Sequence, residues 1–260
     1  MFDTHTHLNV DAFDGMVADV VARAIEAEVS DMAVVGVDVA TSRRAVELAG
    51  QYPGTLHAVV GIQPNSVAES TDGDFDKIAA MVTEPGVVAV GETGLDCYWD
   101  DTPIEDQQTM FDRHIDLCLR TGLPMVIHMR ESCDLIIDQL RRRSTLPAGI
   151  MHSFTGNADQ CRQCLDLGLM ISFAGMVTFK KSDDLRSVAA IVPDDRLLVE
   201  TDCPYLSPEP MRGKRPNEPS RVRYTVQCLA KVRGVSVEAL AKRTVENARG
   251  IFGLGGGVED

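Results

Sequence analysis

Short apolar segments alternate with longer amphipathic segments along most of this chain. The apolar segments are too short for buried helices and predict strands near residues 2–7, 32–37, 56–61, 87–92, 124–128, 148–152, 169–173 and 196–201. Between them, apolar residues recur at helical spacing, and the segment 105–121 is a clear example. No hairpin turn signal joins two of the segments, so we expect parallel strands connected by crossover helices.

Parallel strands joined in this way fit both an open, doubly wound sheet and a closed barrel. An open sheet gathers its site at one switch point, whereas a barrel brings the carboxyl ends of all eight strands into one mouth. Polar residues of metal-ligand type stand where five of the apolar segments end: His5 and His7, Glu92, His128, His152 and Asp202. We therefore predict an α/β fold of the TIM (β/α)8 barrel class.

The length of 260 residues suits a single barrel domain, which we place at residues 1–253. We find no linker, internal repeat or low-complexity segment that would divide it. Residues 220–252 carry two further helical patterns, which we expect to pack on the outside of the barrel. Residues 254–260 are predicted to form a C-terminal tail.

The residues at the strand ends suit a divalent cation. His5 and His7 point to the same side of a strand, because side chains alternate along it. Imidazoles mixed with carboxylates suit zinc, manganese or another borderline divalent ion.

The set has room for two ions, which together can hold a phosphate or carbonyl oxygen and activate a water molecule. His5, His7 and Asp202 could hold one ion and His128 and His152 the other, with Glu92 bridging them. Asp202 could also orient the water or accept its proton. The remaining histidines, His57 and His114, lie within apolar patterns and are expected to be structural.

The charge and the cysteine content indicate which partners and which cellular compartment this protein can have. A net charge of −14 argues against broad adhesion to nucleic acid, although it does not exclude a local phosphate site. Seven cysteines without a disulfide spacing indicate reduced thiols, and Cys161 and Cys164 fit the buried stripe of a helix better than a zinc knuckle. No secretion signal or membrane-length apolar run is visible. We expect a cytoplasmic protein with no membrane association and no obligate protein partner.

Six ordered motifs, covering nearly the whole chain, closely resemble those of the TatD family of metal-dependent hydrolases. The motifs are Asp3-Thr-His-Thr-His7, Gly91-Glu-Thr-Gly-Leu-Asp96, Val126-Ile-His-Met-Arg130, His152-Ser-Phe-Thr-Gly156, Ile171-Ser-Phe-Ala-Gly175 and Glu200-Thr-Asp-Cys-Pro-Tyr-Leu-Ser-Pro208. The resemblance implies a barrel of the amidohydrolase-like type and a divalent-metal deoxyribonuclease or related phosphodiesterase activity. By motif match it implies metal ligation, with Glu92 shared, by His5, His7, Glu92, His128, His152 and Asp202. Arg130 would then lie near the mouth, where a phosphate could bind.

One departure from the family pattern concerns the residues after the third strand. The family usually shows Gly-x-His-Pro-His there, whereas this chain has Gly61-Ile-Gln-Pro-Asn65. Gln63 and Asn65 can hydrogen-bond a substrate or a metal-bound water, but neither can act as an imidazole acid or base. The change implies a slower enzyme or one adapted to another substrate.

The favoured hypothesis is hydrolysis of phosphodiester bonds at DNA ends. Arg212, with Lys214 and Arg215 on the same Pro-rich loop, supplies local positive charge for a phosphate. A few aromatic residues are predicted on mouth loops where a base could stack: Tyr98, Trp99, Phe154 and Tyr205. Two alternatives are a metal-dependent amide, ester or lactone hydrolase acting on a small substrate, and a metal-bound barrel without turnover.

Overall fold

The computed structural model describes residues 1–255, in which eight parallel strands follow one another around a barrel in chain order. The strands are β1 (Phe2–Thr6), β2 (Asp31–Val35), β3 (Leu56–Val60), β4 (Val87–Asp96), β5 (Met125–Arg130), β6 (Gly149–Met151), β7 (Met170–Phe173) and β8 (Leu197–Val199). A parallel bridge between Thr6 and Cys203, and a hydrogen bond from the Asp202 N–H to the His5 carbonyl, join the first strand to the segment after the last. The predicted TIM barrel is confirmed.

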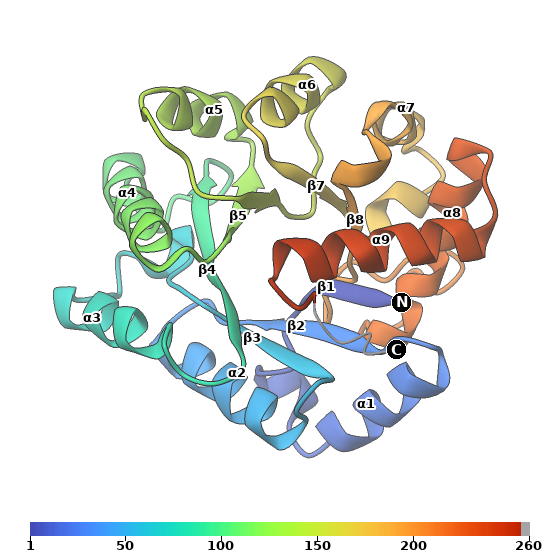
Figure 1. The fold of residues 1–260 in the computed structure, drawn as a ribbon, viewed down its shortest axis with the longest axis horizontal. Helices are drawn as coiled ribbons and strands as arrows, with labels where there is room; N and C mark the ends of the chain where they lie inside the picture. Colours follow the sequence, from blue (N-terminus) through green and yellow to red (C-terminus); the bar gives the residue numbers. More distant parts are fainter. Residues whose placement is uncertain (256–260) are drawn as a thin grey trace.

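Helices surround the strands in the order that the amphipathic segments predict (Figure 1). They are α1 (Val17–Glu26), α2 (Val39–Gln51), α3 (Asp72–Met81), α4 (Ile104–Thr121), α5 (Cys133–Arg141), α6 (Ala158–Asp166), α7 (Asp183–Ile191), α8 (Val222–Arg233) and α9 (Val237–Ile251). None of these helices combines the length and hydropathy that crossing a membrane requires. Cys161 and Cys164 lie on the buried side of α6, as expected.

The last helix differs in position from the sequence expectation. Helix α8 packs against α7 on the outer ring, but α9 crosses the end of the barrel where the strands begin (Figure 1). Ala248 and Phe252 join the apolar side chains that fill the barrel, and the Phe252 ring lies 5.6 Å from that of Phe2. Leu254, expected in the tail, packs on the same cluster, and residues 256–260 of that tail lie outside the described residues. The carboxyl end of the barrel is therefore the end left for a site.

Strand β4 extends past Glu92 to Asp96, further than its apolar run indicates. Gly91 and Gly94 have φ values of 145° and 126°, and a Cβ at Gly94 would overlap the carbonyl oxygen of His128. Only glycine permits this close approach of β4 to β5. Between Val90 and Thr93 the pairing with β5 also shifts register, and such a bulge turns a side chain out of the regular alternation. Glu92 lies within this irregular stretch.

The two histidines expected to be structural lie away from the strand-end cluster. His57 Nε2 contacts Asp31 Oδ1 at 3.2 Å near the start of β2. His114 is fully buried, donates from Nδ1 to the Met110 carbonyl at 2.8 Å, and accepts at Nε2 from the Ile62 N–H at 3.1 Å. This pattern requires a neutral ring, and burial lowers the pKa of His114 from 6.5 to about 4.

We expect acid to destabilise the protein partly through His114. The unfolded chain binds a proton at this residue below pH 6.5, but the folded chain does so only near pH 4, so stability is lost as the pH falls between these values. The loss amounts to about 3 kcal/mol. Urea unfolding should show that the difference in unfolding free energy between wild type and His114→Gln becomes smaller by about this amount from pH 7 to pH 4. A gap that stays constant would contradict the role.

Candidate metal centre

Four strand ends and one following turn bring six potential metal ligands together at the carboxyl end of the barrel. His5 lies on β1 and His7 just after it, Glu92 lies on β4, His128 on β5, and His152 directly after β6. Asp202 adopts a left-handed conformation (φ 54°) in the turn after β8, a conformation that Asp tolerates better than most residues. The predicted residues are thus neighbours in space, although five different strands precede or carry them.

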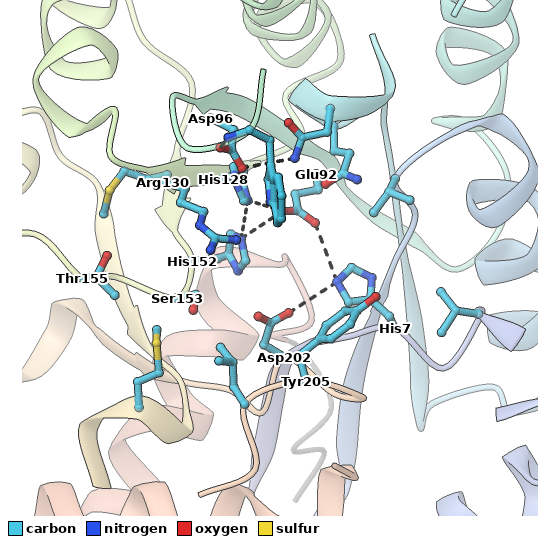
Figure 2. A pocket seen from close by; sticks show the side chains of 18 of the residues that line it. His7, Glu92, Asp96, His128, Arg130, His152, Ser153, Thr155, Asp202 and Tyr205 are labelled. Carbon is cyan, nitrogen blue, oxygen red and sulfur yellow. Dashed lines mark hydrogen bonds and ion pairs between the residues drawn. The ribbon is translucent and has the colours of Figure 1, made fainter. Parts of the chain in front are cut away.

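The Glu92 carboxylate lies at the centre of the cluster (Figure 2). Its Oε1 atom is 2.7 Å from His128 Nδ1 and 3.1 Å from His152 Nε2. Its Oε2 atom faces the other pair, at 3.5 Å from His5 Nε2 and 3.8 Å from His7 Nε2. Each oxygen of Glu92 therefore serves a different pair of imidazoles.

Asp202 completes the group on the Oε2 side. Its Oδ1 atom lies 3.4 Å from His7 Nε2 and 3.9 Å from His5 Nε2. Two of the donor sets lie on the two sides of Glu92: His5 with His7 and Asp202, and Glu92 with His128 and His152. Within each set the donor atoms lie within 4.8 Å of one another. Both sets mix imidazole nitrogen with carboxylate oxygen, a combination that fits borderline divalent cations.

The electrostatics keep the carboxylates charged in spite of burial. Burial would raise the pKa of Glu92, but His152, His128 and His5 hold that pKa well below its ordinary value. Burial would likewise raise the pKa of Asp202, yet His7, His5 and His152 lower it. Burial lowers the pKa of His5, and the neighbouring His152 lowers it further. The cluster thus presents ionised carboxylates, which is the form that binds cations.

Two further carboxylates, Asp96 and Glu200, support the histidines from behind. Asp96 Oδ2 lies 2.9 Å from His128 Nε2, and Glu200 Oε1 lies 3.3 Å from His152 Nδ1. Neither role was predicted from the sequence, although each residue stands inside one of the six family motifs. Their position next to a strand-end motif was the available signal, because metal-binding histidines usually donate their second N–H to such groups.

A cavity of about 690 Å³ opens above the cluster, and most of the predicted substrate residues line it. Gln63, Asn65 and Arg130 belong to its wall. The Asn65 amide also donates to Asp96 Oδ2 at 3.2 Å. Arg212 lies outside the lining, with its guanidinium 4.3 Å from the Phe179 ring centre, and Arg215 of the same loop lines the cavity instead.

Two exposed aromatic residues stand at the cavity wall. Trp99 follows β4 and is 48% exposed, and Tyr205, in the turn after β8, is 57% exposed. Figure 2 shows the Tyr205 ring beside His7 and Asp202. The Arg130 guanidinium lies 3.9 Å from the Tyr98 ring centre and 5.5 Å from that of Trp99. The rim therefore combines aromatic faces with positive charge.

Comparison with known proteins matches residues 2–253 to the family described as TatD related DNase. The chain belongs to the TatD family. It is 38% identical to the metal-dependent hydrolase YabD of Bacillus subtilis, over 97% of this chain and 98% of that protein. It is 34% identical to a protein of Pectobacterium carotovorum named 3′-5′ ssDNA/RNA exonuclease TatD, over 98% of this chain and all of that one.

Among solved structures, the crystal structure of YjjV, a TatD homologue from Escherichia coli, superposes with a TM-score of 0.92. Its sequence identity is 29%, over 97% of this chain and 98% of that chain. This TatD protein is therefore a metal-dependent hydrolase with the barrel of its relatives.

We expect Glu92→Ala to reduce the divalent-metal content of the purified TatD protein sharply. Glu92 contacts both donor sets, and without it two cations would face each other with no shared negative charge between them. Elemental analysis after dialysis against manganese, beside a folding check by circular dichroism, measures the effect. Metal content equal to that of wild type would rule out a shared ligand at this position.

Proposed function

We propose that this TatD protein hydrolyses phosphodiester bonds at the ends of single-stranded DNA with two divalent cations. The division of the Glu92 oxygens between two imidazole pairs is the observation that supports it most directly. In this proposal His5, His7 and Asp202 would hold one cation and His128 and His152 the other, and Glu92 would be available to both. Such a pair of ions supplies Lewis-acid charge for a phosphate and lowers the pKa of bound water.

The residues of the chain itself would perform the remaining tasks. Asp202, ionised and only partly buried, can accept a proton from a water molecule at Oδ2, because Oδ1 faces the other proposed ligands of the cation. Gln63 and Asn65 line the same cavity and offer amide groups to phosphate or sugar oxygens. Neither residue titrates, so Asp202 is left as the proton acceptor on this side of the cavity.

The shape of the cavity favours a strand end over the middle of a duplex. Its volume of about 690 Å³ is that of a small-ligand pocket, and it is suited to one nucleotide unit rather than to a double helix. Trp99 and Tyr205 offer faces on which an unpaired base can stack. Arg130 and Arg215 place positive charge on the wall of an otherwise acidic protein, where adjoining phosphates would pass.

We expect the manganese-loaded protein to shorten linear single-stranded DNA from a free end and to leave circular single-stranded DNA intact. Substrates with either end blocked would identify the direction of attack, and gel analysis of end-labelled strands measures it. A parallel panel of esters and lactones tests the small-substrate alternative. Cleavage of the circle, or turnover of that panel without any cleavage of DNA, would contradict the proposal.

Replacing Trp99 by Ala should raise the KM for single-stranded DNA about tenfold with little change in kcat, because a stacked base contributes roughly 1–3 kcal/mol. Metal content should stay at the wild-type level, since Trp99 is not one of the proposed metal ligands. Tyr224→Ala is the matched control, because Tyr224 on α8 pairs with Arg223 (4.9 Å) away from the cavity. Equal KM values for the two variants would argue against a stacking role.

A further inference from the structure

Behind the metal centre lie two buried polar atoms without hydrogen-bond partners among the described residues. One is Nδ1 of His5, whose side chain is fully buried, and the other is Oε2 of Glu200, which is also fully buried. An unpaired buried polar atom is costly, so such atoms usually have a function. His5 lies on β1 and Glu200 directly follows β8, so the two residues lie on either side of the junction that closes the barrel.

The two atoms belong to one cluster. One ring nitrogen of His5, one of His152 and one oxygen of Glu200 lie within 4.8 Å of one another. The rings of His5 and His152 are stacked, with centres 3.9 Å apart and planes inclined by 14°. Both rings direct Nε2 toward Glu92, at 3.5 Å and 3.1 Å, so Nδ1 is the nitrogen that each has left for Glu200.

Glu200 already holds one of these rings. Its Oε1 atom accepts from the Ser153 N–H at 2.6 Å and lies 3.3 Å from His152 Nδ1. Its Oε2 atom remains available, on a carboxylate that can accept several hydrogen bonds. An imidazole that gives its Nε2 lone pair to a cation keeps its proton on Nδ1, and that N–H then needs an acceptor.

We propose that Glu200 is a positioning residue that holds His5 with one oxygen and His152 with the other, and so ties the two cation positions together. This inference rests on the metal centre of the proposed function, in which His5 and His152 would hold different cations. If His5 shifts toward Glu200 on metal binding, its Nδ1–H can donate to Glu200 Oε2. Both unpaired atoms then gain a hydrogen-bond partner. Glu200 touches no substrate in this arrangement and acts only through the histidines.

The same cluster could instead hold a third cation between His5, His152 and Glu200. Three facts oppose this reading. Each Nδ1 would have to lose its proton while Nε2 is also bound, Oε1 is already engaged by Ser153, and the ion would lie close behind two others. Metal stoichiometry distinguishes the two possibilities. A Glu200 that only positions His5 and His152 predicts two ions per chain, whereas a third cation site predicts three.

The test is Glu200→Gln, which keeps the shape of the side chain but leaves one oxygen to serve two N–H groups. Titration with zinc against a fluorescent chelator should show both cations bound about 10–100-fold more weakly than in wild type. Asp31→Asn is the matched control, because it alters a buried carboxylate–imidazole pair, Asp31 with His57, at the opposite end of the barrel. That variant should bind zinc as wild type does, even if its melting temperature falls.

A second measurement needs no variant. In zinc-loaded wild type, nitrogen-15 NMR of the imidazoles should show slowly exchanging Nδ1–H groups at His5 and at His152, in addition to that of the buried His114. Zinc affinity unchanged by Glu200→Gln, a rapidly exchanging His5 N–H, or three ions per chain would each overturn the proposal. A wild type that binds no divalent ion would overturn it together with the proposed function, whereas bound ions without DNA cleavage would remove the substrate assignment alone.

Discussion

The site depends on one buried carboxylate shared by four imidazoles. Glu92 is 3% exposed, and its charge is tolerated because histidines from β1, the turn after it, β5 and the turn after β6 surround both oxygens. No pair of neighbouring strands can supply such an environment. Closure of the barrel brings β1 next to β8 and across from β4, and the cluster exists only in the closed form.

The alternation of short apolar and longer amphipathic segments was sufficient to predict the order of strands and helices, because each element carries its own periodicity. It failed where the structure depends on contacts between distant segments. Gly91 and Gly94 resemble a strand end in sequence, yet they allow β4 to continue against β5. Helix α9 has an ordinary amphipathic pattern, and only its contacts with Phe2 and the other inner residues place it across the barrel end.

The candidate site likewise has a part that the sequence predicts and a part that depends on contacts between distant segments. Strand ends of a parallel barrel converge by geometry, so the sequence could predict that His5, His128 and Asp202 would meet. Asp96 and Glu200 act on the far nitrogens of histidine rings, and ring orientation is not visible in a sequence. The choice between Arg212 and Arg215 depends on the path of one loop, which a run of basic residues does not specify.

Charge balance explains how so acidic a chain could act on a polyanion. Glu92, Asp96, Glu200 and Asp202 surround the histidines, and so many carboxyl groups in a small volume disfavour the approach of a phosphate. Two divalent cations would carry four positive charges, which would offset the charge of these carboxyl groups. Arg130 and Arg215 would then make the cavity wall positive. In this account the proposed ions provide more than reactivity, because they also make the cavity more favourable to a negatively charged substrate.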